Sequence, residues 1–180
     1  PPVFEEFAGI AEATGLSLPE LVIGNGWTDF KDLISARGAS HNCTSIAAGA
    51  PLTADGHTYI AQTWDMNVTA APHLVVVRRH PSDGPRTLTL TTAGCLSLIG
   101  MNEHGVALGN TNLTPTDAQP GVFYLALIHE ALRQRDLAGA IEAITRGPRM
   151  SGHYYHLADA TDAFAGLETT GRRHVRVELV

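Results

Sequence analysis

Short runs of alternating or β-branched residues, separated by turn signals, dominate the middle of this chain and restrict its fold. Thr and Leu alternate along residues 86–92, the period-2 pattern of a strand with one buried face. The turn Pro81–Pro85 precedes this segment, and the β-branched segment 74–79 precedes the turn. Strands joined by such short turns pair antiparallel, because a parallel pair needs a crossover of about a dozen residues or more. The sequence therefore predicts an antiparallel sheet.

Other segments have the same strand character. Asp55–Gly56 is a hairpin signal directly before one of them. Cys95 lies inside another, where we expect a buried, protonated thiol. The predicted strands are 43–48, 57–64, 74–79, 86–92, 95–100, 105–110, 153–158, 163–168 and 174–180.

Helical periodicity occurs before the first strand and again after residue 121. Leu125, Ile128, His129 and Leu132 fall on one face of a helix, and Asp136 is a helix cap. The predicted helices are 3–15, 17–23, 28–36, 122–135 and 136–145. The order of helices, sheet, helix pair and sheet predicts an α+β fold, in which two antiparallel sheets pack face to face with flanking helices outside. We expect the last two helices to cover one face.

The charge balance excludes several classes of partner. The chain has 12 Lys and Arg against 18 Asp and Glu, a net charge of −6, and no basic run exceeds two residues. Binding to phosphates needs clustered cations, so we expect no nucleic-acid partner. The apolar runs are far shorter than the roughly 18 residues of a membrane span, and no signal-peptide pattern opens the given sequence. Two cysteines make no disulfide framework, so we expect reduced thiols in a cytoplasmic protein with no membrane partner.

Both ends lead us to expect a piece of a longer protein. The sequence opens on Pro1–Pro2 without Met, and residues 176–180 have a strand pattern with no polar tail after it. An edge strand leaves backbone groups unpaired. We therefore expect strand 174–180 to pair with polypeptide outside this sequence.

Cys43 is the first candidate for chemistry. It opens a predicted strand after the polar residues His41 and Asn42, where solvent and a carbonyl group can approach a thiol. The alternative is a small buried hydrophobic residue at the start of a strand. The sequence pattern around Cys43 leaves both interpretations open.

Asp65 and Asn112 are further candidates, because each follows or ends a predicted strand. Asp65 could hydrogen-bond the amine of a nucleophile or a substrate, or it could cap a turn. The side-chain amides of Asn110 and Asn112 could donate to an oxyanion. The alternative is an Asx turn ahead of Pro115.

The nine histidines do not fall at metal-ligand spacings. His153 and His156 are three residues apart, and on a strand they face opposite sides. No phosphate-binding loop occurs among the glycines. We expect neither a metal site nor a cofactor.

Several short motifs follow one another in a specific order. Cys43–Ser45 (Cys-Thr-Ser) opens a strand, and Gln62–Asp65 (Gln-Thr-Trp-Asp) ends the next. The turn 100–106 (Gly-Met-Asn-Glu-His-Gly-Val) and the strand end 110–113 (Asn-Thr-Asn-Leu) come later. In this order, over about residues 4–170, the chain resembles the acyl-coenzyme A:6-aminopenicillanic acid acyltransferase (isopenicillin N acyltransferase) family of N-terminal nucleophile hydrolases, which is related to the bile salt hydrolase and penicillin V acylase group. The segment 7–16 resembles the family's pro-region helix.

The resemblance implies an αββα sandwich, the N-terminal nucleophile hydrolase fold, in a precursor that cuts itself before its cysteine. Residues 1–42 would be a helical pro-region, and residues 43–180 would be the hydrolase core, incomplete at its C-terminus. The family's His-Thr-Asn-His segment, which carries an oxyanion asparagine, would fall after Val180. We therefore expect a second chain or a further C-terminal segment to complete the fold.

The resemblance also assigns roles to individual residues. The scissile bond would be Asn42–Cys43, and Cys43 would become the new N-terminus and the nucleophile. Asp65 resembles the acid near the nucleophile, and Asn112 resembles an asparagine near the oxyanion site. Gln62 stands at a substrate-binding position where the bile salt hydrolase group has an arginine. The family usually has glycine where this chain has Asn42.

Three functions from different classes are consistent with the sequence. The first is a self-processing cysteine enzyme, an amide hydrolase or acyltransferase that acts on a small N-acyl substrate through a thioester. The second is a non-catalytic or unprocessed homologue that acts as a binding or structural domain. The third is a metal-dependent hydrolase that uses the histidines. The identity of the substrate stays open.

Overall fold

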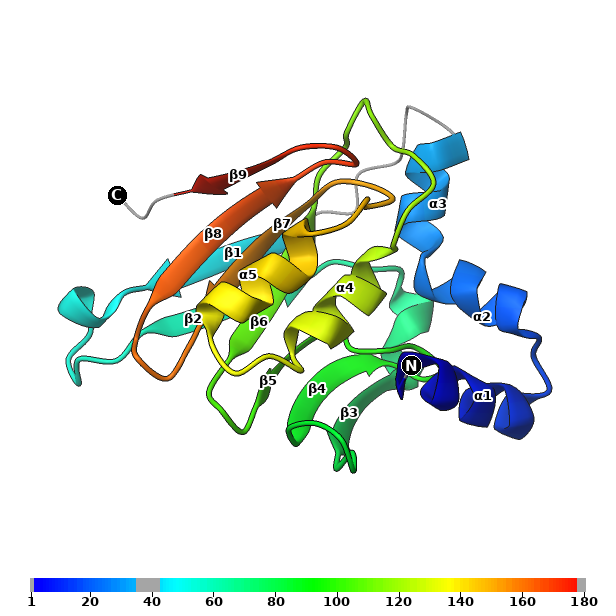
Figure 1. Ribbon diagram of the computed structural model, residues 1–180, viewed down its shortest axis with the longest axis horizontal. Helices are drawn as coiled ribbons and strands as arrows, with labels where there is room; N and C mark the ends of the chain where they lie inside the picture. Colours follow the sequence, from blue (N-terminus) through cyan, green and yellow to red (C-terminus); the bar gives the residue numbers. More distant parts are fainter. Residues whose placement is uncertain (1, 35–42, 178–180) are drawn as a thin grey trace.

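The computed structural model describes residues 2–34 and 43–177 as five α-helices, two short 3-10 helices and nine strands (Figure 1). The helices are α1 (Pro2–Thr14), α2 (Leu18–Asn25), α3 (Trp27–Ile34), η1 (Ala50–Leu52), η2 (Val68–His73), α4 (Tyr124–Ala131) and α5 (Leu137–Thr145). The strands are β1 (Cys43–Ala48), β2 (Tyr59–Trp64), β3 (Leu74–Arg79), β4 (Thr87–Thr92), β5 (Ile99–Asn102), β6 (Ala107–Asn112), β7 (His153–Ala158), β8 (Phe164–Thr169) and β9 (His174–Val177).

Strands β3 to β9 form one seven-stranded sheet in chain order, and β1 and β2 form a separate two-stranded sheet. Every neighbouring pair is antiparallel, so the sheet type predicted from the short turns is confirmed. Strand β9 is the last in its sheet, and no described strand lies along its outer edge. The pairing expected for residues 174–180 stays a prediction, and residues 178–180 lie outside the described ranges.

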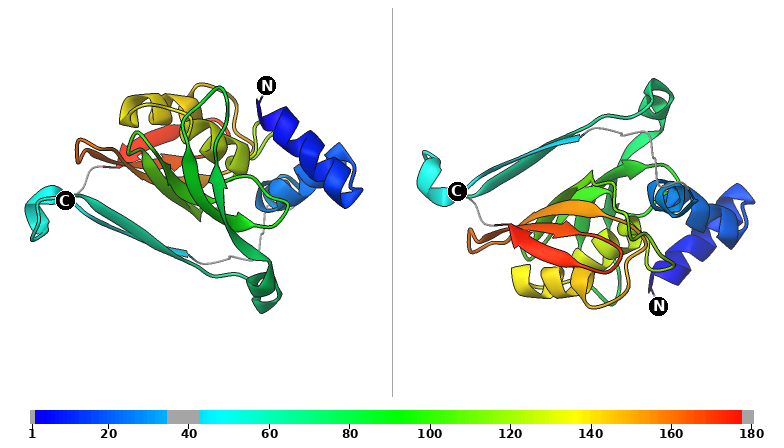
Figure 2. Two further views of the ribbon diagram at one scale, coloured as in Figure 1. Left: turned by 90° about the horizontal axis from the view of Figure 1, so that it is seen from below. Right: turned by 90° about the horizontal axis from the view of Figure 1, so that it is seen from above.

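The two faces of the seven-stranded sheet have different cover (Figure 2). Helices α4 and α5 pack on one face, as expected, and bury Leu108, Tyr155 and Leu167 there. The β1–β2 sheet lies across part of the other face. The architecture is therefore α+β, with two antiparallel sheets and flanking helices.

The fourth, helical layer of the expected αββα sandwich is not formed by the described residues. Helices α1 to α3 pack beside the sheets and not over the outer face of β1–β2 (Figure 2). Ile46 and Tyr59 on that outer face are 64% and 55% exposed. The described ranges thus show three layers.

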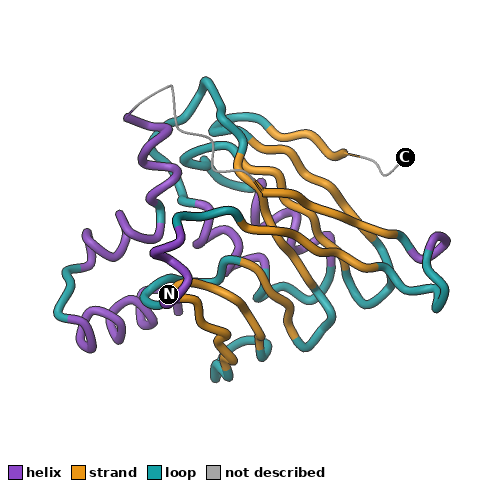
Figure 3. The backbone as a smooth tube through the Cα atoms, turned by 180° about the vertical axis from the view of Figure 1, so that it is seen from behind, coloured by secondary structure: helices purple, strands orange, loops and turns teal. Residues whose placement is uncertain are grey.

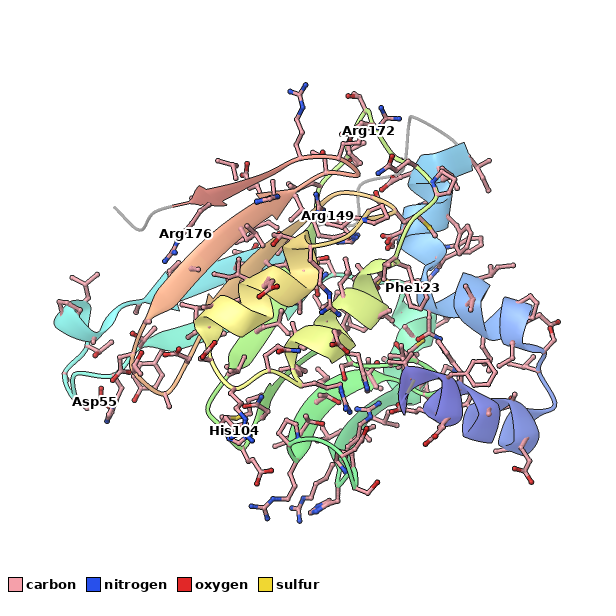
Figure 4. All side chains as sticks on the ribbon, viewed as in Figure 1. Asp55, His104, Phe123, Arg149, Arg172 and Arg176 are labelled. Carbon is pink, nitrogen blue, oxygen red and sulfur yellow. The ribbon has the colours of Figure 1, made fainter. Side chains whose placement is uncertain are left out.

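Buried side chains of α1 and α2 join the N-terminal helices to the rest of the chain. Phe7 is buried with its ring centroid 6.3 Å from that of Phe123, at the start of α4 (Figure 4). The Asn25 amide oxygen accepts the Leu96 N–H at 2.7 Å, and its nitrogen donates to the Gly94 carbonyl at 3.1 Å. Residues 2–34 therefore share one core with the sheets.

Helix α3 contributes a buried carboxylate. The Asp29 side chain is 1% exposed, and its Oδ1 lies 2.7 Å from His153 Nε2 on β7. Its Oδ2 accepts the N–H of Tyr124, the first residue of α4, at 2.9 Å. A carboxylate at a helix N-terminus stabilises the unpaired N–H groups there. Asp29 thus links α3, α4 and β7.

The predicted strand 95–100 is wrong for residues 95–98, which form a loop. Gly94 turns the chain with a φ of +83°, a conformation that favours glycine. The Asn25 side chain then takes the Leu96 N–H that a strand would offer to its neighbour. Cys95 therefore lies in a loop and not inside a strand.

The predicted helix 122–135 is shorter in the structure. Helix α4 ends at Ala131, because the Asn102 side chain donates to the carbonyls of Leu132 and Gln134, at 2.9 and 2.7 Å, and draws the chain out of the helix. The other predicted helices and strands agree with the structure within two residues at each described end.

We expect Asp29→Asn to destabilise the protein strongly. The amide places an NH2 group where one of the two carboxylate oxygens accepted a hydrogen bond, and a buried group that loses its partner costs roughly 1–3 kcal/mol of the free energy of unfolding. Urea unfolding followed by circular dichroism measures the change. Glu12→Gln, on the exposed side of α1, removes the same charge and is the control. Equal unfolding midpoints for the two variants would contradict the proposed anchoring of α3.

Candidate active site

The inner face of β1–β2 presents two short rows of side chains to the seven-stranded sheet. Along β1, Cys43 and Ser45 are half-buried, and Thr44 between them is exposed. Cys43 pairs with Trp64 on β2, and Ser45 pairs with Gln62. Because side chains alternate along a strand, Cys43 and Gln62 both point into the space between the sheets.

The edge of β6 provides backbone N–H donors that face this space between the sheets. Strand β5 pairs with β6 only through Gly100 and Met101, so the edge of β6 from Gly109 onward is open. The Asn110 N–H donates to Gln62 Oε1 at 2.7 Å. Two residues further along the same edge, the Asn112 N–H faces Cys43 and lowers the pKa of its thiol.

Gly109 allows this close approach. A Cβ atom at this position would lie 2.3 Å from Gln62 Oε1 and 2.5 Å from His156 Nε2. Both separations are too short for real contacts, so a side chain here would push the Gln62 carboxamide and the His156 ring out of their present positions. The sequence motif Asn-Thr-Asn-Leu gave no sign that the preceding glycine has this role.

The surroundings of Cys43 leave its thiol protonated near neutral pH. Burial raises the pKa of the Cys43 thiol, and the negative charge of Asp65 raises it further. Hydrogen bonds from the backbone N–H groups of Asp65 and Asn112 favour the thiolate and act in the opposite direction on the pKa. The net shift is upward, so the thiol needs a base to become a nucleophile.

The structure brings together three of the residues selected from sequence. Asp65 and Asn112 both act on the pKa of the Cys43 thiol, and Gln62 lies one inward position away along β2. Asn112 lies within β6 and not beyond its end, and its backbone N–H is the group that acts on the thiol. The Asp65 side chain, directly after β2, is exposed. Asn42 lies outside the described residues.

The second thiol and the histidines lie elsewhere. Burial raises the pKa of Cys95, which has no charged group among the causes of its shift. His153 faces Asp29 on the helix side, and His156 faces Gln62 between the sheets, as the strand spacing predicted. Within residues 2–34 and 43–177, no group of three or more His, Cys, Asp or Glu side chains is arranged to hold a metal ion.

A protein-family model described as acyl-coenzyme A:6-aminopenicillanic acid acyl-transferase matches residues 52–178. The chain belongs to this family. The matched region contains Gln62, Asp65 and Asn112 and begins after the strand that carries Cys43. Membership of an acyltransferase family places the chain among acyl-transferring or acyl-hydrolysing enzymes. No curated protein matches the chain, and no helix in the described ranges has the length and apolar character to cross a membrane.

We expect Asp65→Asn to make Cys43 more reactive toward iodoacetamide. The substitution removes the negative charge that raises the pKa of the thiol, so more thiolate is present at pH 8. Because Asp65 is exposed and its charge is screened by solvent, we expect a gain of about two- to fivefold in alkylation rate. Mass spectrometry of peptides measures the rate, with Cys95 in the same sample as the control. An unchanged or slower rate at Cys43 would show that the carboxylate does not act on the thiol.

Proposed function

We propose that this protein is a cysteine amide hydrolase or acyltransferase that cuts its own chain between Asn42 and Cys43 and then acts on a small N-acyl substrate. The observation that carries the proposal is the position of Cys43 on the inner face of β1 beside the open edge of β6, where the backbone N–H groups of Asp65 and Asn112 favour its thiolate. Two N–H groups beside a sulfur nucleophile are suited to the oxyanion that forms on the carbon to which the sulfur bonds. The family match supports acyl transfer as the reaction class.

The first step in this proposal is self-processing. The Cys43 sulfur attacks the carbonyl carbon of residue 42, the C–N bond breaks, and the freed α-amine of Cys43 takes a proton. Water then hydrolyses the thioester and releases the new N-terminus. The raised pKa of Cys43 means that the thiol has to lose its proton during the attack.

The second step uses the new N-terminus. An α-amine has a reference pKa of about 8, so an appreciable neutral fraction at pH 7 can take the thiol proton. The thiolate attacks the substrate amide, an S–C bond forms, and the leaving amine takes the proton. The acyl group then passes from sulfur to water in a hydrolase, or to a second amine in an acyltransferase. In this proposal the exposed Asp65 carboxylate orients the α-amine.

Two other functions make different predictions. A non-catalytic homologue would keep the bond between Asn42 and Cys43 and would show a single intact mass. A metal-dependent hydrolase would lose activity with a chelator and keep it after thiol alkylation. The proposed enzyme gives the opposite result in each case.

Cys43→Ala is expected to abolish both self-cleavage and amine release from N-acyl substrates. Cys43→Ser should process slowly or not at all with the fold intact, because far less of a hydroxyl than of a thiol is ionised near neutral pH. Cys95→Ala, the control, removes the other thiol and should leave both reactions intact. Intact mass and a colorimetric assay for released amine measure the outcome. Normal cleavage and turnover in Cys43→Ala would overturn the proposed function.

After cleavage, we expect the N-terminal piece to stay bound to the remainder. It contributes buried Phe7 and Leu21 to the common core, and Asp29 to the pair with His153. Gel filtration in buffer should show one species of the full mass, and the same sample in denaturant should show two. Two species in buffer would contradict this prediction.

A further inference from the structure

A polar cavity of about 310 Å³ lies on the helix-covered face of the seven-stranded sheet. It is lined by residues of α1, β3, β4 and α4, which come together at one corner of the molecule (Figure 1), and by the turn 81–85 and Ser97. The β1–β2 sheet, which carries Cys43, crosses the opposite face (Figure 3). The cavity is therefore separate from the candidate active site.

Polar side chains are buried beside this cavity, at positions where a covered sheet face is normally apolar. Thr87 on β4 is 9% exposed, and Thr89 and Ser97 are fully buried. His129 on α4 is also buried, with its Nδ1 3.2 Å from Ser97 Oγ. Burying a polar group costs free energy that an apolar side chain would not cost. Such departures from the core pattern are expected at functional sites.

Two side-chain atoms at the cavity have no hydrogen-bond partner among the described residues. Thr87 Oγ1 is buried and unpaired, whereas Thr89 on the same face of β4 accepts a hydrogen bond from Arg79 at 2.7 Å. His129 Nε2 lies 4.0 Å from Glu6 Oε2, which is too far for a hydrogen bond. Buried polar atoms without partners are rare and normally have a water or a ligand beside them.

The charges around the cavity leave one carboxylate in excess. Among the described residues, the Asp, Glu and Arg side chains that line it are Glu5, Glu6, Asp83, Arg79 and Arg133. Arg79 Nε donates to both oxygens of Glu6 at 3.0 Å, and Arg133 pairs with Asp83 at 3.2 Å. The Glu5 side chain has no ion-pair or hydrogen-bond partner among the described residues. The cavity therefore favours a cation over an anion.

We propose that this cavity binds a small organic cation with a primary ammonium group and about ten non-hydrogen atoms, at about 30 Å³ for each atom. One donor nitrogen can bridge Glu6 Oε2 and His129 Nε2, because two acceptors 4.0 Å apart can each lie at about 2.8 Å from it. Nε2 accepts when Nδ1 donates to Ser97 Oγ, and burial lowers the pKa of His129 and keeps its ring neutral at pH 7. Thr87 Oγ1 is a further acceptor on the wall, and Glu5 supplies the unpaired charge.

The bound cation would also join two parts of the chain. Glu5 and Glu6 lie on α1, within residues 1–42, whereas the other walls come from β3, β4 and α4. A ligand that binds only the folded state raises the midpoint of unfolding. We therefore expect the cation to strengthen the attachment of α1 to the sheet. The inference does not depend on the proposed function.

The binding test uses three probes of similar size and different charge: 2-phenylethylamine, 2-phenylethanol and phenylacetate. Pro81 and Pro85 offer apolar wall for the ring. Isothermal titration calorimetry of the full chain with Cys43→Ala, at pH 8 where histidine is uncharged, measures each affinity. We expect the amine to bind at least about tenfold more tightly than the alcohol, because its hydrogen bonds to the protein are charge-assisted. Phenylacetate should bind more weakly than either.

Two substitutions at the cavity test its assignment. Thr87→Val removes the unpaired hydroxyl with little change of shape and should weaken amine binding by about three- to tenfold. Without the amine, this variant should unfold at the same midpoint or a higher one, because the hydroxyl has no partner in the protein. Glu5→Gln should weaken binding by about two- to fivefold, since this carboxylate is exposed. Glu12→Gln, which removes the same charge from α1 outside the cavity, is the matched control and should change nothing.

Gln62→Leu, at the candidate active site, should also leave the affinity for the amine unchanged. Amine binding that Gln62→Leu weakens and Thr87→Val does not would place the amine between the sheets and overturn this inference. No binding of the amine, equal affinities for the three probes, or preference for phenylacetate would overturn it as well. A parent chain without self-cleavage or turnover that still binds the amine at this cavity would overturn the proposed function alone.

Discussion

The hydrogen bond from the Asn110 N–H to Gln62 Oε1 joins the two sheets of this protein. An edge of β6 without a strand beside it would leave buried backbone donors unpaired, at about 1–3 kcal/mol each. Gln62 takes one of these donors, and the next one along the edge, the Asn112 N–H, faces Cys43 and lowers the pKa of its thiol. Gly109 makes the approach possible, because a Cβ atom would occupy the same space. The position of the candidate nucleophile and the packing of the sheets therefore depend on the same open edge.

A sulfur between the β1–β2 sheet and the open edge of β6 is shielded from solvent and lies near backbone N–H donors. Burial keeps the thiol protonated, which protects it from unspecific chemistry, while two backbone N–H groups favour the charge that develops during attack. The missing component is a base. In the proposed enzyme the α-amine of Cys43 supplies it, and that amine is free only after the bond to Asn42 has been cut. The buried Asp29–His153 pair keeps the N-terminal helices in place around this chemistry.

Several parts of this arrangement were accessible from the sequence, and others were not. Period-2 segments with short turns predicted the antiparallel sheets, and the periodic apolar face of residues 122–135 predicted a covering helix. The loop at 95–98 was missed, because its backbone partner is the side chain of Asn25, about seventy residues earlier. The early end of α4 was missed for the same reason, since Asn102 donates to the carbonyls of Leu132 and Gln134 directly after the helix. A local pattern carries no information about partners so distant in the chain.

The sequence by itself determined the class of the fold, the family and the identity of a possible nucleophile, because these depend on local periodicity and on short motifs in a fixed order. Tertiary structure decided what surrounds that nucleophile. It selected the backbone of Asn112 as the group that acts on the thiol, and it placed His156 beside Gln62 between the sheets. These relations arise where β5 and β6 separate and a second sheet crosses the gap. Such a crossing is set by the packing of strands far apart in the chain, which no single segment encodes.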